Sequence, residues 1–579
     1  MCSIGSFLHG AELVRDLSQY SRKPDDKIAL VLSGGGAKGI AHIPVFEMLE
    51  KYNIVPDYII GTSMGSLMGG LYASGLNASE LAELVINENF VSLFSTYPPP
   101  PMSPLDSIDP SRSELVGFSF DEHGLSDRSG VIDDFRITSL LNRYVYPLGN
   151  KSDFDDLPVK YRAVAYNFTR REREVISEGN IVEAMRASMG IPIIFQIYRI
   201  GECGYLDGGL VDNIPVSVAM DLGANIIITS DVTDKDDKAG DSFIALGARL
   251  ISQVNQTRFN SIDPGKNSTI YIAHDNSGFS MLGFHKAAEI LERSRKTVEA
   301  FDSDFAKLMA EGASHPSDRL SSKGVVARVR LSDVSNRTRD DSGEYPDESS
   351  YELEEYLYER FSRYAGRGID SDFLDEFEAE LSDVRTRLDL DTIGYVLDDV
   401  GDGAYDVRIR FGEKKPAKFR IGISQDLGAT AFGMKGYPAG YELDPTLKIG
   451  IDFYSRNVKH LVNSFSLALK RDISVSLGYE LTYRNRFSPY YFQYRMDYDA
   501  GIIFNGGSKI KRFFENYDRA IGFEADFFFD EKDFDISIGL RNSIYVLNKA
   551  MRDFDIRKDS DVLFARFRGI FLDSHVPRI

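Results

Sequence analysis

The chain has 579 residues, too many for a single hydrophobic core, and this length suggests about three to four domains. Its hydrophobic fraction of 43% and its charged fraction of 27% are those of folded protein, so long disordered stretches are not expected. The formal net charge of −21 excludes nucleic acid as an expected partner, because binding to phosphates needs a concentrated surplus of Lys and Arg.

Residues 1–26 form an N-terminal segment without the pattern of a signal peptide, although Cys2 could be a lipidation site if the chain is trimmed before it. Residues 1–20 contain no continuous apolar core of a signal peptide, so an exported protein would need a leader outside this chain. No part of the chain reaches the roughly 20 consecutive apolar residues of a spanning helix, which leaves strands or a surface patch for any membrane insertion. Cys2 and Cys203 are the only cysteines, so neither a disulfide framework nor a cysteine zinc site is expected.

Residues 27–315 alternate short apolar runs with helical patterns, which is typical of an α/β layered domain. Four of the runs have the character of buried strands and predict one parallel-type sheet: residues 28–32, 58–60, 162–166 and 225–229. Residues 97–104 contain four consecutive prolines, which can form neither a helix nor a central strand. We interpret this stretch as a surface excursion, either a lid or a plain loop.

A glycine-rich loop at residues 33–39 follows the first strand and precedes a helix. Consecutive glycines allow backbone N–H groups to converge on an anion, because no Cβ obstructs the approach. Gly34, Gly36 and Gly39 also satisfy the G-x-G-x-x-G fingerprint of dinucleotide sites, with Asp57 near the distance expected for a ribose ligand. This alternative fails on position, because Asp57 precedes the second strand and does not end it.

The second strand ends in Gly61-Thr62-Ser63-Met64-Gly65, directly before a helical run. A G-x-S-x-G sequence between a strand and a helix is typical of a nucleophile elbow, in which small neighbours allow a tight turn that exposes the serine hydroxyl. The helix that follows directs its N-terminal N–H groups at the same place and favours negative charge there. Ser63 is therefore the candidate nucleophile, and the anion at the glycine loop would be the oxyanion of an acyl-transfer reaction.

Asp207 is the candidate base, and it is followed by Gly208 and Gly209. Glycines beside an aspartate at a strand end allow it to approach another part of the backbone closely. Asp207 would accept the Ser63 proton directly, provided that burial raises its pKa toward the working range. An Asp-Gly-Gly sequence taken alone would be interpreted as a turn.

The glycine loop, the elbow and the later Asp-Gly-Gly, in this order within one α/β domain, resemble the patatin-like phospholipases. The resemblance extends from residue 27 to about residue 234 and includes residues 187–192, which are similar to the family's Ala-Ser-x-x-Pro segment. It implies a three-layer hydrolase domain, a phospholipid or related lipid ester as substrate, and no metal or organic cofactor. It also implies a site that consists of a Ser63 and Asp207 dyad without histidine, an oxyanion hole at Gly34, Gly35 and Gly36, and Lys38 where the family has Arg or Lys.

Residues 323–415 follow a polar connector and have a different pattern. We expect strands at residues 325–331, 392–397 and 404–411, and helices at residues 351–364 and 371–385. This β-α-α-β-β order resembles a POTRA domain, the small α+β periplasmic module that precedes outer-membrane barrels.

Residues 416–579 alternate apolar and polar residues with a period of two, most clearly at 473–483, 492–498, 521–529 and 534–540. A soluble β-sandwich would alternate in the same way. The length of the runs, an apolar face rich in Tyr and Phe, and charges on the other face favour an outer-membrane β-barrel. The sequence has no Trp and does not end in a closing aromatic strand, so we expect the barrel in this chain to be incomplete.

The three regions together resemble the patatin-like autotransporters, which implies a location in the outer membrane or at the cell surface of a Gram-negative bacterium, with membrane contact through the C-terminal strands. Two alternatives stay open. One is a histidine-dependent triad, for which His274 or His285 would have the right place in the chain; His42 could also line the site. The other is a membrane assembly or transport module that carries the α/β region as a passenger.

Overall fold

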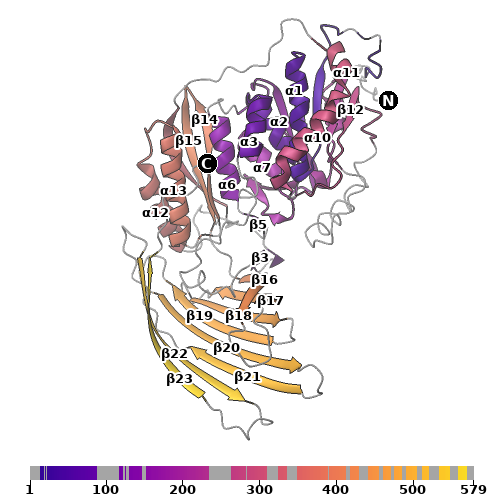
Figure 1. Ribbon diagram of the computed structural model, residues 1–579. Helices are drawn as coiled ribbons and strands as arrows, with labels where there is room; N and C mark the ends of the chain where they lie inside the picture. Colours follow the sequence, from indigo (N-terminus) through magenta and orange to yellow (C-terminus); the bar gives the residue numbers. More distant parts are fainter. Residues whose placement is uncertain are drawn as a thin grey trace, which may run out of the picture.

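The computed structural model describes residues 13–87, 116–146, 152–233, 262–309, 324–334 and 348–412, together with the strands between residues 417 and 569, apart from short gaps inside these ranges. The described residues form an α/β domain, a smaller α+β domain beside it and a long antiparallel sheet (Figure 1). Within them, no helix has both the length and the apolar character needed to cross a membrane. The proline-rich stretch at residues 97–104 lies outside the described residues.

An eight-stranded sheet forms the centre of the α/β domain. In spatial order its strands are β12 (Ile270–Ala273), β11 (Ile226–Asp231), β1 (Ile28–Leu32), β2 (Tyr58–Thr62), β6 (Lys160–Asn167), β10 (Cys203–Asp207) and β9 (Tyr198–Ile200), with β7 (Glu172–Ile176) also paired to β6. The four predicted strands are present and pair in parallel, as expected. Beyond them the sheet is mixed, because β10 and β7 run antiparallel to β6, and β9 runs antiparallel to β10.

Helices and short 3-10 helices connect the strands of this domain. Their bounds are η1 (Gly36–His42), α1 (Ile43–Lys51), α2 (Met64–Ser74), α3 (Ala78–Asn87), α6 (Asp134–Val145), α7 (Ile181–Ser188), η4 (Gly208–Leu210), α8 (Val216–Asp221), η5 (Phe284–Lys286), α10 (Ala287–Glu299) and α11 (Asp302–Lys307). A separate parallel pair joins β5 (Gly130–Ile132) to β8 (Ile193–Phe195).

Strand β1 shows why the domain has three layers. All its residues are buried, and successive side chains of a strand point to opposite faces of the sheet. Leu30 belongs to a hydrophobic cluster that includes residues of α1, α2, α3 and α10, whereas Val31 belongs to a second cluster that includes residues of α8. Helices therefore cover both faces of the sheet, which agrees with the predicted three-layer arrangement. Burial of each such side chain stabilises the fold by about 1.5–3 kcal/mol.

The α+β domain has the predicted order of strand, helix, helix, strand, strand. Its elements are β13 (Val325–Asp333), α12 (Glu348–Ser362), α13 (Ser371–Leu388), β14 (Thr392–Gly401) and β15 (Ala404–Gly412). β15 lies in the middle of the sheet, parallel to β13 and antiparallel to β14. Phe361 and Phe377 of the two helices share one hydrophobic cluster with Val407 of β15, and this cluster also includes Phe135 and Tyr146 of the α/β domain.

The C-terminal sheet consists of long strands that each pair antiparallel with the next along the chain. They are β16 (Ala417–Ala429), β17 (Tyr441–Tyr454), β18 (Leu461–Lys470), β19 (Val475–Arg484), β20 (Tyr491–Phe504), β21 (Lys511–Ala520), β22 (Phe534–Leu547) and β23 (Lys558–Gly569). The strands predicted near residues 473–483, 492–498 and 534–540 are confirmed as β19, β20 and β22, and the run at 521–529 lies outside the described residues. β3 (Val116–Asp121), which pairs with β4 (Gly124–Leu125), extends this sheet beside β16.

Candidate active site

Ser63 lies in the turn between β2 and α2, where the sequence predicts a nucleophile elbow. Its backbone has φ 55° and ψ −123°, a conformation that L-residues rarely adopt and that costs on the order of 1–3 kcal/mol. The neighbouring glycines make this turn possible. A Cβ on Gly61 would lie 2.4 Å from the Gly65 carbonyl oxygen, and a Cβ on Gly65 would lie 2.5 Å from the Leu32 carbonyl oxygen.

The Ser63 hydroxyl donates a hydrogen bond to the Asp207 carboxylate, with 2.6 Å between Oγ and Oδ2. Both side chains are buried. The other carboxylate oxygen of Asp207 accepts the Gly209 N–H at 2.7 Å, which fixes the orientation of the carboxylate. Gly208 is required for this approach, because a Cβ at this position would lie 2.1 Å from the Val164 carbonyl oxygen in β6. The structure therefore brings together the two residues that the sequence suggests as nucleophile and base.

Burial raises the pKa of Asp207 from its usual value near 3.8 to about 6. Burial penalises the charged carboxylate, whereas hydrogen bonds from Ser63 and from the Gly209 amide, together with the charge of Arg186, favour it and lower the pKa. The result is a carboxylate that is ionised at neutral pH and more basic than an exposed aspartate. This is the property expected of a base that takes a proton from serine.

Ser188, at the end of α7, forms a hydrogen bond with the backbone of the elbow. Its hydroxyl oxygen accepts the Ser63 N–H at 2.9 Å, and its hydroxyl donates to the Val164 carbonyl oxygen at 2.6 Å. No sequence motif predicts this role for Ser188. The Ala-Ser-x-x-Pro resemblance at residues 187–192 was the one signal that pointed to this segment.

The glycine loop lies directly against the nucleophile. A Cβ on Gly34 would be 3.0 Å from the Ser63 Cβ and 2.5 Å from the Asn213 side-chain oxygen, so this position requires glycine. The Gly34 N–H donates to the Asn213 carbonyl oxygen at 3.2 Å. Gly36 has φ 58°, in the left-handed region that favours glycine, and the loop then enters η1, in which Lys38 is buried.

Two of the three candidate histidines, His42 and His274, make other contacts. His42 is buried, with Nδ1 2.8 Å from Ser230 Oγ and Nε2 2.9 Å from the Ser33 carbonyl oxygen. His274 is also buried, with its ring nitrogens 2.9 Å from Ser230 Oγ and from Ser294 Oγ. Burial lowers the pKa of His42 to about 4 and that of His274 to about 3, so both rings are neutral at physiological pH.

His285 lies in η5, and the described contacts place none of these three rings on Ser63 or Asp207. Asp57, the residue that a dinucleotide site would need for ribose, instead accepts the Ile28 N–H at 2.7 Å at the start of β1. Across the described ranges, no group of three or more His, Cys, Asp or Glu side chains is arranged to hold a metal ion.

Comparisons with known proteins match this part of the chain. The family described as patatin-like phospholipase matches residues 30–220. Lysophospholipase NTE1 of Scheffersomyces stipitis is 30% identical over 221 residues, which cover 37% of this chain and 12% of that protein. Patatin-like phospholipase domain-containing protein 6 of Homo sapiens is 30% identical over 234 residues, which cover 40% of this chain and 15% of that protein. The chain therefore spans only a small part of the length of these relatives.

Two solved structures are also similar to part of this chain. The crystal structure of VipD from Legionella pneumophila has a TM-score of 0.27 at 15% identity and covers 49% of this chain and 67% of that chain. The type III effector protein ExoU has a TM-score of 0.26 at 15% identity and covers 49% of this chain and 54% of that chain. These scores are too low to establish a shared fold. The family model and the curated relatives agree that residues 30–220 match a patatin-like phospholipase domain.

Proposed function

We propose that this protein is a serine hydrolase that cleaves acyl esters of phospholipids or related lipids through a Ser63 and Asp207 dyad. Ser63 Oγ attacks the ester carbonyl carbon while its proton moves to Asp207 Oδ2, and the alcohol leaves with that proton. Water then attacks the acyl-enzyme and gives a proton to Asp207, which returns it to Ser63 Oγ as the fatty acid is released. The 2.6 Å hydrogen bond between the two buried side chains is the observation that supports this mechanism most strongly.

The oxyanion hole is proposed at the glycine loop, beside the N-terminus of α2. The Gly34 N–H already donates to the Asn213 carbonyl oxygen, which leaves the amides of Gly35 and Gly36 as the better donors in this conformation. Gly34 then has a steric role, since its lack of a Cβ lets the loop approach Ser63. Lys38 lies in η1, directly after these glycines, at the position where the family has Arg or Lys. One donor of this kind typically lowers the barrier by about 3 kcal/mol.

The substrate class is proposed from the family and from the names of the relatives, one of which is a lysophospholipase. A dyad of this kind needs only an accessible ester carbonyl. The aligned region is a small part of those relatives, so the physiological lipid has to be identified by assay of this chain.

The mechanism is tested by Ser63→Ala and Asp207→Asn, assayed on a chromogenic butyrate ester and on a monoacyl phospholipid. We expect kcat to fall by about 10³-fold or more in both variants, because nucleophile and base act as one unit. Asp231→Asn is a matched control, since Asp231 is another buried aspartate at a strand end but it bonds to Thr233. Full activity in either dyad variant would exclude the mechanism.

Two further variants distinguish the dyad from the alternative of a histidine-dependent triad. His274→Gln and His285→Gln should retain activity if the dyad is correct, and at least one should lose it if a histidine is the base. His274 is tied to Ser230 and Ser294, so its variant requires a check of folding by circular dichroism.

We also propose that the C-terminal strands associate this protein with an outer membrane, and that residues 323–415 form the POTRA-like module that precedes them. The proposal is supported by the neighbour-to-neighbour antiparallel order of strands that have 10 to 14 residues each. A tilted membrane strand requires about 9–11 residues, so all of these strands are long enough. Recovery of the chain as a monodisperse protein without detergent, and its failure to bind liposomes, would exclude this proposal and its implied location at the cell surface.

A further inference from the structure

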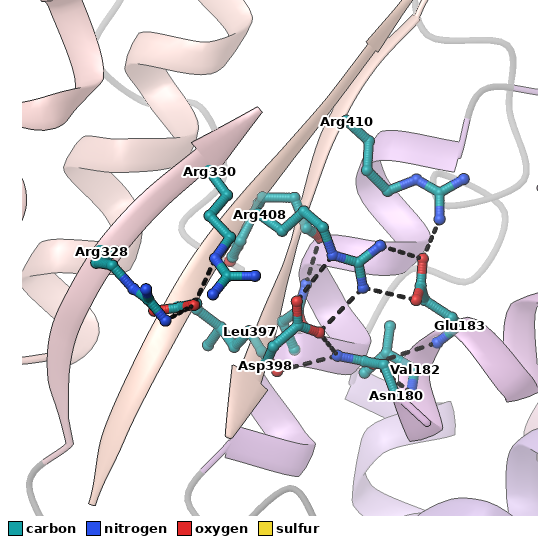
Figure 2. Close-up of polar contacts among 12 residues, drawn as sticks. Asn180, Val182, Glu183, Arg328, Arg330, Leu397, Asp398, Arg408 and Arg410 are labelled. Carbon is teal, nitrogen blue, oxygen red and sulfur yellow. Dashed lines mark hydrogen bonds and ion pairs between the residues drawn. The ribbon is translucent and has the colours of Figure 1, made fainter. Parts of the chain in front are cut away.

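A buried ion cluster joins the α+β domain to helix α7 of the α/β domain (Figure 2). At its centre is Glu183 of α7, whose side chain is only 3% exposed. Arg408 of β15 holds this carboxylate with two hydrogen bonds, of 2.7 Å from Nη2 to Oε2 and 3.2 Å from Nη1 to Oε1. Arg410, two residues further along β15, also bonds to Glu183 and packs over the Tyr198 ring.

The start of α7 is held by the same domain. Asn180 caps the helix, because its side-chain oxygen accepts the Val182 N–H at 3.0 Å. Its side-chain amide donates to the Leu397 carbonyl oxygen and to Asp398 Oδ1 of β14, both at 3.0 Å. Asp398 in turn accepts hydrogen bonds from Arg408 at 2.8 and 3.0 Å. Figure 2 shows this closed network between β14, β15 and the first turn of α7.

The other end of α7 touches the proposed dyad. Ser188, the last residue of the helix, accepts the Ser63 N–H, and the charge of Arg186 lowers the pKa of Asp207. Arg186 is itself fully buried and paired with Asp134. The helix has eight residues and so a length of about 12 Å at 1.5 Å per residue. A shift of its first turn is therefore transmitted to its last turn with little loss, since a hydrogen-bonded helix of this length moves as one piece.

We infer that Arg408 and Arg410 are positioning residues of the active site, which act through α7 on the elbow at Ser63. The inference rests on the proposed function of Ser63 and Asp207, and extends it by making the α+β domain part of the catalytic unit. Loss of Arg408 would remove a bidentate partner from both Glu183 and Asp398 and leave Glu183 paired with Arg410 alone, so we expect the first turn of α7 to move. A displacement of about 1 Å at a reacting group can reduce the rate by about 10²-fold.

The chain contains a matched control for this cluster. Asp406 of β15 is as buried as Glu183 and is likewise held by two arginines, Arg328 at 2.9 Å and Arg330 at 2.6 Å. All three residues belong to the α+β domain, and Figure 2 labels the two arginines, Arg328 and Arg330. Asp406→Asn therefore disturbs a comparable network in the same strand without a direct contact to α7.

The test compares Arg408→Gln with Asp406→Asn in the full chain. We expect Arg408→Gln to lower kcat on the butyrate ester, and the rate at which a fluorophosphonate probe labels Ser63, by about tenfold or more, while KM changes by less than about threefold. Hydrogen exchange of the α7 amides should accelerate in Arg408→Gln alone. Arg408→Lys, which keeps the charge but loses the two-pronged contact, should have an intermediate kcat and provides the test if Arg408→Gln does not fold.

The outcomes distinguish a positioning role of Arg408 from general damage to the α+β domain and from failure of the proposed function. Wild-type kcat and labelling in Arg408→Gln would overturn the inference, as would an equal loss in Asp406→Asn, which would indicate general damage to the α+β domain. If the unaltered chain neither hydrolyses esters nor reacts with the probe, the proposed function fails. In that case hydrogen exchange of α7 still reports whether β15 holds the helix in place.

Discussion

Asp207 is hydrogen-bonded to Ser63 and is buried, and these two features together predict how the activity depends on pH. Its pKa is raised to about 6 by burial, and only the ionised form can take the Ser63 proton. We therefore expect kcat/KM for the butyrate ester to fall about tenfold per pH unit below about pH 6 and to be level between pH 7 and 8. A series of rate measurements from pH 4.5 to 8 checks this limb. An inflection at pH 4 or below would mean that a different group is the base.

The raised pKa of Asp207 also affects stability: activity should rise with pH, whereas the contribution of this carboxyl group to folding should fall. Because the pKa of Asp207 is higher in the folded than in the unfolded chain, the folded state binds its proton more tightly. This group therefore favours folding below about pH 4, and the advantage is lost as the pH rises through about 6. Asp207→Asn should be inactive yet more stable than the unaltered chain at pH 7.5, on the order of 1–3 kcal/mol, with the difference vanishing near pH 4. Equal stability at both pH values in urea titrations would contradict this reasoning.

The residues of the site differ in how far they could be predicted from the sequence. Ser63 and Asp207 stand in local motifs that imply a turn, and the turns are where expected. Their 2.6 Å contact could not be derived from those motifs, because it depends on β10 lying antiparallel beside β6. The role of Ser188 could not be predicted, because a hydroxyl group that accepts one backbone N–H produces no recognisable pattern in the sequence.

At the scale of elements, the contact between β1 and α2 depends on one glycine. A Cβ on Gly65 would lie 2.5 Å from the Leu32 carbonyl oxygen and 2.6 Å from that of Ser33, and backbone atoms cannot move aside cheaply. Gly65→Ala should therefore lower the free energy of unfolding by about 2 kcal/mol or more, although alanine normally favours a helix. Gly394→Ala is the control, because the nearest atom to its Cβ would be 3.7 Å away, and its change should stay within about 1 kcal/mol. Urea unfolding of both variants tests the pair, and equal stabilities would show that α2 can shift.

The positions of strands can be predicted from the sequence more reliably than whether neighbouring strands run parallel or antiparallel. The apolar composition of a run such as residues 28–32 predicts a strand, and the observed β1 has the same bounds. Whether a strand runs parallel or antiparallel depends on the path of the connecting chain, so the reversal at β10 was not foreseen. The pairing of β3 with β16 joins positions about 300 residues apart and has no local sequence signal.

At the scale of the whole molecule, the two compact domains share their hydrophobic cores. Helix α6 contributes Leu140 to the core of the α/β domain and Phe135 to that of the α+β domain, and Val396 of β14 belongs to the α/β core. Asn142 of the same helix also donates to the Tyr395 carbonyl oxygen at 2.9 Å. Because neither core is complete without residues of the other domain, we expect the two domains to unfold as one cooperative unit.

A cavity inside the α+β domain tests that expectation. Leu381 of α13 is fully buried within the α+β domain, and Leu381→Ala should destabilise by about 2–5 kcal/mol. If the domains unfold together, hydrogen exchange of the β1 amides should accelerate by about 30-fold or more, by the same factor as that of the β14 amides. Tyr358→Ala on α12 is the control, since Tyr358 is 56% exposed and its loss should leave both rates nearly unchanged. Faster exchange in β14 with none in β1 would mean that the domains unfold independently, and that the shared core residues are too few to couple them.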